Sequence, residues 1–196
     1  YDGGVFAKTL LEGDIHTDNQ KAVGLSTRDE AKTFLYAICY GAGVAKLGQI
    51  VGKGPKEGQK VRDRFFKKLP AFKKFRDDVM KKAETGYLRG LDGRRVPVRS
   101  THSALNTLCQ SAGAIICKRW VVEFHRIMKR EGYIEGTDYQ QVAFVHDEIQ
   151  VLTKKGLGND IGETAVRAIE LSGNWYGLRL PLTGEYKIGR NWAETH

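Results

Sequence analysis

The spacing of apolar and polar positions predicts a chain that begins with helices. Thr27-Arg28-Asp29-Glu30 has the form of a capping box, and Gly41 follows the last apolar position, so we expect a helix over residues 28–40. Two more helices are expected at about 56–68 and 71–85, divided near Pro70. The glycines between residues 41 and 58 predict only short pieces in that stretch.

Further along, the pattern changes to strands mixed with helices. Apolar segments on both sides of Asp92-Gly93 predict a hairpin over residues 87–98, and apolar positions recur with helical period over about 103–130. Segments 141–145 and 149–152 predict two strands, followed by a helix at 160–174. The order of elements favours an α+β fold, with a helical lobe beside an antiparallel sheet layer.

Composition narrows the class of protein. The 196 residues are 41% hydrophobic and 28% charged, as in folded proteins, and their apolar runs are too short to cross a bilayer, so no membrane partner is expected. The three cysteines, Cys39, Cys109 and Cys117, lack metal-binding spacing and leave an odd thiol. This usage favours a reducing, cytoplasmic setting.

The positive charge is concentrated in one region. Of a formal net charge of +9, nearly all lies in residues 53–82, which carry twelve basic and four acidic side chains. Such an excess favours anionic partners, nucleic acid before acidic membranes. Within it, we expect Lys67, Lys68, Lys73 and Lys74 either to attract nucleic-acid phosphates or only to keep the chain soluble.

A stripe of four residues follows the helix predicted at 28–40. Arg28, Lys32, Tyr36 and Tyr40 are each four residues apart, and the first and third are about 12 Å apart along the axis. Two cations near the helix start could hold phosphates while the ring of Tyr36 packs near a sugar or base, which predicts a nucleoside triphosphate. The same spacing also fits a solvated cationic edge with both tyrosines in the core.

Two adjacent carboxylates mark a second candidate site. Asp147 and Glu148 join the two apolar strands, where burying a carboxylate costs free energy unless a cation or donors compensate it. Mg²⁺ suits such oxygen ligands, although a simple polar hairpin tip has the same sequence. Two-metal phosphoryl transfer also needs an aspartate on a neighbouring strand, and residues 1–27 hold no convincing one.

Several motifs, in order and over essentially the whole chain, resemble the C-terminal part of family A DNA polymerases, closest to those of T7-like phages. The motifs are the helix stripe ending in Tyr40-Gly41, the segments 14–17 and 145–148, and the segments 91–94, 104–108, 110–114 and 189–193. The resemblance implies the helical fingers lobe and part of the antiparallel-sheet palm of a polymerase right hand. Residues 1–86 would be fingers, with a palm-derived lead-in at 1–12, and residues 87–196 the C-terminal half of the palm.

The resemblance implies nucleotidyl transfer from deoxynucleoside triphosphates to a primer 3′ end, in DNA replication. Arg28, Lys32 and His16 would contact the triphosphate, and Lys32 would protonate the leaving pyrophosphate. Tyr36 would pack against the deoxyribose. Since the family carries Phe or Tyr at this position, and Tyr goes with poor rejection of dideoxynucleotides, the chain should accept dideoxynucleotides readily.

The same resemblance assigns the metal and the DNA contacts. Asp147 would ligate both catalytic Mg²⁺ ions and Glu148 would support the site. DNA contacts are implied for Tyr40, Asn106, Gln110, His146, Arg94, Arg95 and Arg99. Asn106 and Gln110 would meet the minor-groove side of the nascent pair, where acceptors common to all correct pairs permit a check of geometry.

The family's first metal-binding aspartate lies before the region in which Tyr1 stands, so we expect one carboxylate ligand, the thumb and any exonuclease to be missing. The chain alone should then not polymerise, and a complementing N-terminal polymerase portion would be required. A processivity factor would bind the missing thumb. The expected location is the cytoplasm of an infected bacterium.

Two other interpretations fit parts of the sequence. A single-subunit phage RNA polymerase shares an Arg/Lys/Tyr-Gly helix, although the His146-Asp147-Glu148 tip and Gln110 favour the DNA enzyme. A noncatalytic basic nucleic-acid-binding module would make the stripe and the carboxylates incidental.

Overall fold

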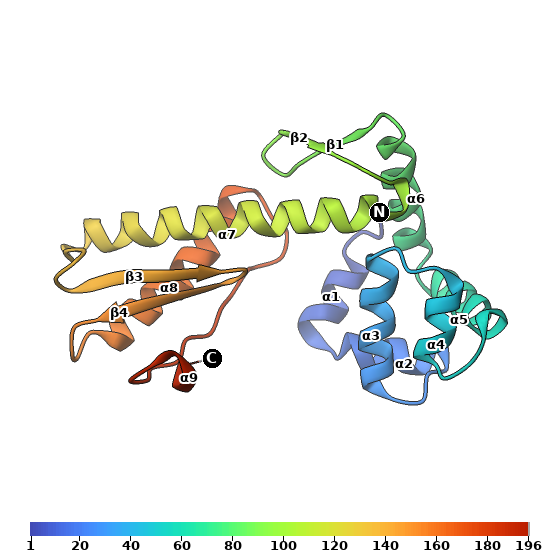
Figure 1. The fold of residues 1–196 in the computed structure, drawn as a ribbon, viewed down its shortest axis with the longest axis horizontal. Coiled ribbons are helices and arrows are strands. Elements are labelled where there is room, and N and C mark those ends of the chain that lie inside the picture. Colours follow the sequence, from blue (N-terminus) through green and yellow to red (C-terminus); the bar gives the residue numbers. More distant parts are fainter. Residues whose placement is uncertain (196) are drawn as a thin grey trace. The chain divides into compact units, whose positions relative to one another are not determined.

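The computed structural model describes residues 1–195 and divides them into two compact units (Figure 1). Unit 1 consists of Tyr1–Gly90 with Arg94–Cys109, and unit 2 consists of Leu91–Gly93 with the chain from Gln110 onward. The mixture of helices and two small antiparallel sheets confirms the predicted α+β class. No helix in residues 1–195 combines the length and apolar character that a membrane span needs.

Unit 1 is mainly helical. Its elements are α1 (Val5–Glu12), α2 (Ile15–Val23), α3 (Arg28–Cys39), α4 (Val44–Ile50), α5 (Pro55–Lys68), α6 (Pro70–Ala83), β1 (Tyr87–Arg89), β2 (Arg95–Pro97) and the 3-10 turn η1 (Thr101–Ser103). Of these, α3, α5, α6 and the β1–β2 hairpin were predicted. The helices α1, α2 and α4 were not.

The start and the end of α3 follow from its sequence. The Thr27 hydroxyl accepts a hydrogen bond from the Glu30 backbone amide at 3.1 Å, and the Glu30 carboxylate accepts one from the Ser26 amide at 2.9 Å. These bonds satisfy amides that have no partner inside the helix. At the other end Gly41 turns to a φ of 79°, a conformation that glycine adopts without steric cost.

A close approach places the end of α3 against the segment before α7 (Ala104–Arg130). A Cβ atom on Gly41 would lie 2.1 Å from the carbonyl oxygen of His102, so no larger residue fits there. Glycine therefore ends the helix and also permits this contact between backbones.

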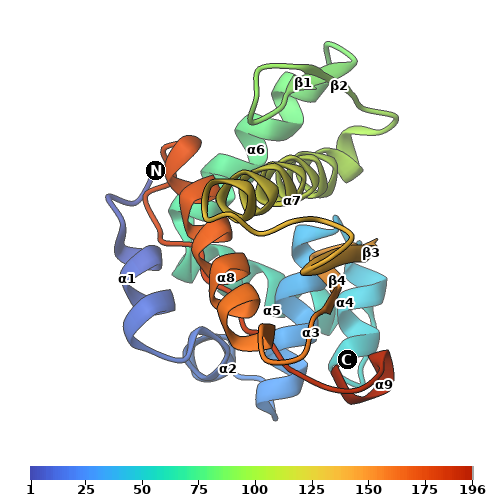
Figure 2. The same cartoon turned by 90° about the vertical axis from the view of Figure 1, so that its left-hand side faces the viewer.

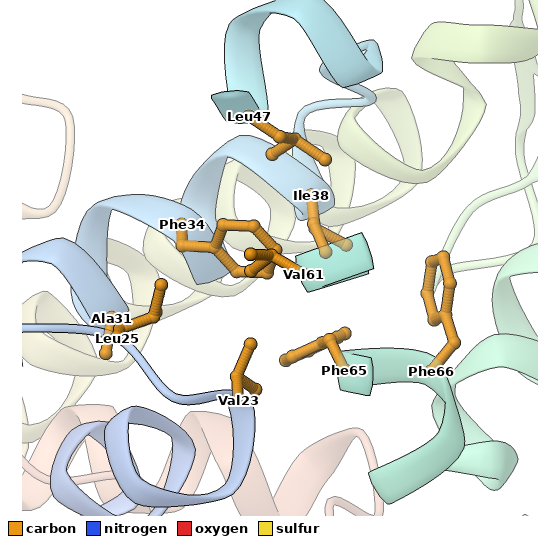
Figure 3. Packing of buried hydrophobic residues seen from close by; sticks show 9 residues of the cluster. All are labelled: Val23, Leu25, Ala31, Phe34, Ile38, Leu47, Val61, Phe65 and Phe66. Atoms are coloured by element: carbon orange, nitrogen blue, oxygen red, sulfur yellow. The ribbon is translucent and has the colours of Figure 1, made fainter. Parts of the chain in front are cut away.

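The core of unit 1 lies between α2, α3, α4 and α5 (Figure 3). Phe34 and Phe65 are fully buried and meet edge to face, with their ring centroids 5.8 Å apart. The buried members of this cluster are Val23, Leu25, Ala31, Phe34, Ile38, Leu47, Val61, Phe65 and Phe66. Because Ala31, Phe34 and Ile38 point inward, the opposite side of α3 is left to solvent.

Unit 2 contains most of α7, the strands β3 (Tyr139–Val145) and β4 (Glu148–Thr153), and the helices α8 (Gly158–Trp175) and α9 (Trp192–Thr195). Figure 2 views α7 nearly along its axis, with α8 beside it. Phe124 and Met128 of α7, Tyr139 of β3 and Ile161 and Ala168 of α8 form its core. The antiparallel pairing runs from Tyr139 opposite Thr153 to Val145 opposite Glu148, with an irregularity near Gln141.

The segment after α8 lies against that helix at glycines. A Cβ atom on Gly162 would lie 2.3 Å from the ring of Tyr186, and one on Gly173 would lie 3.1 Å from Leu182. Small residues on α8 therefore allow the extended segment to pack closely before it leads into α9.

Candidate functional site

The four predicted nucleotide-site residues, His16, Arg28, Lys32 and Tyr36, lie in unit 1 on α2 and α3, and Tyr40, predicted to contact DNA, caps the end of α3. Tyr36 and Tyr40 are 47% and 55% exposed, so the interpretation that places both tyrosines in the core is wrong. Their rings stack at an interplanar angle of 20°, with centroids 6.5 Å apart. Lys32 is exposed on the same helix and makes no ion pair within residues 1–195. The stripe is thus accessible to a ligand over its length.

His16 reaches the same place from α2. Its ring lies 6.4 Å from that of Tyr36, between centroids. Its Nδ1 atom is buried and has no hydrogen-bond partner in the described part of the chain. A buried nitrogen without a partner is costly, and a ligand atom could satisfy it. The position fits the predicted phosphate contact.

Asp14 connects these two helices. Its carboxylate accepts bonds from the backbone amides of His16 and Thr17, at 3.0 and 3.3 Å, and so caps the start of α2. It also accepts a bond of 2.7 Å from Nε of Arg28, at the start of α3. The Arg28 guanidinium, then the Thr17 hydroxyl, hold the pKa of Asp14 well below its usual range. Asp14 therefore stays ionised at any pH near neutral.

Sequence reasoning did not give Asp14 a role of its own. The signal available was an acidic residue at a helix N-cap, two positions before His16. Its pairing with Arg28, fourteen residues later, depends on the turn at Gly24, which has a φ of 72°. That pairing could not be read from spacing within one helix.

The second group of predicted residues is the tip of the β3–β4 hairpin in unit 2. His146 has a φ of 55°, the one positive value outside glycine in residues 1–195. A left-handed residue at this point lets two strands join through a short turn. Asp147 follows and is exposed, and Glu148 begins β4.

The two carboxylates have different surroundings. Glu148 accepts a hydrogen bond of 3.1 Å from Nε1 of Trp192 and a second one from the side-chain Nε2 of Gln150. Asp147 is exposed, whereas Glu148 is partly buried. Burial, and then the negative charge of Asp147, raise the pKa of the Cys117 thiol on α7.

Asp147 and Glu148 also line a cavity of about 490 Å³. Its other walls are β4, α8 and the segment from Glu185 to Trp192. Within residues 1–195 no group of three or more His, Cys, Asp or Glu side chains could enclose a metal ion. Mg²⁺ commonly takes one or two protein carboxylates. The exposed Asp147, next to a Glu148 that is fixed by hydrogen bonds, could therefore supply part of the ligand set of a Mg²⁺ ion.

The remaining predicted DNA contacts are distributed over three places. Arg94, Arg95 and Arg99 are exposed in and after the β1–β2 hairpin, and the guanidinium of Arg95 lies 3.9 Å from the Tyr87 ring centroid. Asn106 and Gln110 are one turn apart on α7. Oδ1 of Asn106 is buried without a partner among the described residues, whereas Gln110 is exposed. Their contacts with DNA stay predictions.

Comparison with known proteins decides the family. The model of DNA polymerase family A matches residues 7–194. The chain belongs to DNA polymerase family A. Its likeness to the T7-like phage enzymes is also confirmed, because it is 41% identical to the DNA-directed DNA polymerase of Escherichia phage T7 and 40% identical to that of Enterobacteria phage T3.

Both alignments cover 100% of this chain but 30% of each relative, so the chain spans about a third of the length of these polymerases. Among solved structures it is similar to the POL domain of Pol1 from M. smegmatis, determined in complex with DNA primer-template and dNTP. The TM-score is 0.78 at 20% identity, over 92% of this chain and 34% of the other. This likeness shows the polymerase right-hand fold.

The family match decides among the three interpretations of the sequence. Family A DNA polymerases are nucleotidyltransferases, so the noncatalytic module and the RNA polymerase fragment are not supported. Membership of the family also implies catalysis with divalent metal ions in general. The roles of single residues belong to the proposal that follows.

Proposed function

We propose that this chain supplies the triphosphate-binding surface and one metal-binding carboxylate of a template-directed DNA polymerase. The observation that carries the proposal is the exposed stripe on α3, with Arg28 and Lys32 at its start, the stacked Tyr36 and Tyr40 beyond them, and His16 beside it. A nucleotide has the same order, with charged phosphates at one end and the sugar and base rings at the other, so the cations can meet the phosphates while the aromatic rings meet the sugar or base.

In the proposed reaction the primer 3′ oxygen attacks the α-phosphate of a bound deoxynucleotide. Arg28 and His16 hold the phosphates, and Lys32 donates a proton to the pyrophosphate as it leaves. The ring of Tyr36 packs against the deoxyribose and orients the sugar. Fixing the nucleotide in this way lowers the entropic cost of bringing its α-phosphate and the primer 3′ oxygen together.

On the palm side, Asp147 would hold Mg²⁺ at its exposed carboxylate, with Glu148 supporting the site through its bonds to Trp192 and Gln150. Two Mg²⁺ ions, when bound, neutralise charge on the attacking and leaving oxygens. Such a pair needs carboxylates from neighbouring strands, and in residues 1–195 no group of three or more His, Cys, Asp or Glu side chains could enclose a metal ion. We therefore propose that a complementing N-terminal polymerase portion supplies the other ligand, and that this chain alone does not extend a primer.

Primer-template DNA is the proposed macromolecular ligand. Asn106 and Gln110 would face the minor groove of the nascent pair, with Tyr40 and His146 near the template base and the primer end. Arg94, Arg95 and Arg99 would contact phosphates. In this proposal residues 1–86 act as fingers and residues 87–196 as half of the palm. The enzyme replicates phage DNA in the cytoplasm of an infected bacterium, with a processivity factor bound to the thumb.

The test uses the assembled polymerase, meaning this chain together with the N-terminal polymerase portion, and measures single-nucleotide incorporation on a primed template. Lys32→Ala should lower the rate about 100-fold or more, as expected for loss of a general acid. Lys46→Ala, which removes an exposed lysine from neighbouring α4, serves as the matched control and should stay within about twofold. A Lys32→Ala rate within a few-fold of wild type would remove the proposed role.

The role of Asp147 is tested by binding. Mg²⁺ or Mn²⁺ is titrated in the presence of a deoxynucleotide, with Asp147→Ala compared with the unaltered assembly. The variant should need a much higher metal concentration for the same occupancy, because a carboxylate ligand is gone. Equal binding by both proteins would show that Asp147 is not a metal ligand.

A further inference from the structure

We propose that Asp14 is a positioning residue for nucleotide binding: it sets the orientation of the Arg28 guanidinium and its place relative to His16. The inference rests on the proposed function and adds to it a residue that does not itself touch the nucleotide. It is carried by the geometry of one carboxylate between two helices.

Each oxygen of Asp14 has a separate task. Oδ1 accepts from the backbone amides of His16 and Thr17 and so fixes the first turn of α2. Oδ2 accepts from the Thr17 hydroxyl at 2.9 Å and from Nε of Arg28 at 2.7 Å. The backbone that presents His16 and the side chain of Arg28 are thus tied to the same rigid group.

The nitrogen atom through which Arg28 binds Asp14 determines which of its N–H groups can donate to a ligand. Asp14 engages Arg28 through Nε, and in residues 1–195 the two terminal nitrogens of Arg28 have no carboxylate partner. A guanidinium held by Nε keeps its terminal N–H groups available for phosphate oxygens, to which they can donate in pairs. The carboxylate therefore aims the cation without occupying the nitrogens that grip the ligand.

The pair contributes little to folding stability. The side chains of Arg28 and Asp14 are 51% and 43% exposed, and exposed ion pairs contribute little to stability. The capping role of Asp14 can be served by asparagine, which is an equally good N-cap. Asp14→Asn therefore removes the charge and the Arg28 acceptor while the helix start is kept.

The first measurement is the steady-state KM for a deoxynucleotide in the assembled polymerase. Asp14→Asn should raise KM about 10-fold, the effect of losing a hydrogen bond to a charged group, with kcat changed less than KM. Asp29→Asn is the matched control, because Asp29 is also acidic and close enough to raise the pKa of Arg28, yet makes no hydrogen bond to it. This control should leave KM within about twofold of wild type.

The second measurement asks whether Asp14 acts through Arg28. In an Arg28→Ala background, Asp14→Asn should have no further effect on KM, since the group it orients is gone. Equal effects in both backgrounds, an unchanged KM, or a lowered KM would each overturn the inference. If Arg28→Ala itself leaves KM unchanged, the proposed triphosphate site is wrong. If Arg28→Ala raises KM but Asp14→Asn does not, only the positioning role is wrong.

Discussion

In unit 1 one residue predicted to contact the triphosphate, Arg28, is held by a side chain of the same unit, whereas in unit 2 the two carboxylates stand at the tip of a two-stranded hairpin. Arg28 is bonded to Asp14, and α3 rests on a cluster of buried aromatic residues. Asp147 is exposed, and only Glu148 is held by the segment after α8. Of the two proposed sites, the one for the triphosphate therefore has a cation already oriented within this chain, whereas the proposed Mg²⁺ ligand Asp147 has no such support among the described residues.

The β3–β4 hairpin and the helical core of unit 1 also differ in how far their apolar side chains are buried. Val142, Phe144 and Leu152, on the β3–β4 hairpin, are 55%, 40% and 64% exposed, although strands usually bury such residues on at least one face. In unit 1 the corresponding large residues, Phe34 and Phe65, are fully buried. A sheet of two strands is too small to cover both its faces.

The largest expected effect tests this contrast in packing. Phe65→Ala should lower the free energy of unfolding by about 3–5 kcal/mol, because a fully buried ring is replaced by a cavity. Phe144→Ala, the matched change on the hairpin, should cost less than about 1 kcal/mol. Urea unfolding monitored by circular dichroism measures both. Equal losses would mean that the hairpin face is as well packed as the helical core.

The thiols offer a second test. Burial, and then the nearby Cys109, raise the pKa of Cys39 to about 11, so its thiolate fraction near neutral pH should be about 100-fold below that of a free thiol. Labelling with a disulfide reagent should therefore be slower at Cys39 in unit 1 than at Cys117 in unit 2. In denaturant the two rates should converge; a persisting difference would mean that burial is not the cause.

A third, smaller effect concerns sugar recognition. Tyr36 is 47% exposed, and in the proposed site its hydroxyl would compensate for a missing 3′-hydroxyl, so Tyr36→Phe should increase the rejection of dideoxynucleotides about 10-fold or more. The measurement is the ratio of kcat/KM for deoxy and dideoxy substrates in the assembled polymerase. Tyr186→Phe, in unit 2, is the control and should leave the ratio unchanged. An unchanged ratio for Tyr36→Phe would contradict the proposed contact between Tyr36 and the sugar.

The smallest expected effect is on acid stability. The folded pKa of Asp14 is depressed below its unfolded value of about 3.9, so its stabilising contribution is present above pH 4 and is lost as the pH falls through the folded pKa. The difference in stability between wild type and Asp14→Asn should therefore shrink between pH 6 and pH 3. Urea unfolding at both values measures it. A difference that grows on acidification would contradict the sign of the pKa shift.

Much of the fold follows from local signals. Thr27 and Gly41 delimit α3, and the period of apolar residues from Leu105 to Phe124 predicts α7, because these features act within one element. The helix α1 was missed because its apolar residues, among them Val5, Phe6 and Leu10, lie within only eight positions, too few to establish a helical period. The nine-residue α2 was missed although Asp14 and Gly24 cap it, because so short a helix carries little periodicity.

The candidate site was predicted one element at a time. The spacing of Arg28, Lys32 and Tyr36 predicts a stripe, but whether the tyrosines are buried depends on which face of α3 meets α5, a tertiary property. Among the basic residues, Lys73 and Lys74 pair with Asp77 and Asp78, at 2.6 and 3.0 Å, as their i,i+4 spacing on α6 indicates, although the sequence interpretation did not use that spacing. Lysines already neutralised in this way are weaker candidates for phosphate contact than Lys67.

The close packing of the segment after α8 limits which residue can stand at position 162. Trp192 donates a hydrogen bond to Glu148 and follows the segment that packs on α8. In that segment the ring of Tyr186 occupies the space that a side chain at Gly162 would need. A single methyl group at position 162 would have to displace that ring. The packing therefore restricts this position to glycine, although it lies outside every motif on which the proposed chemistry depends.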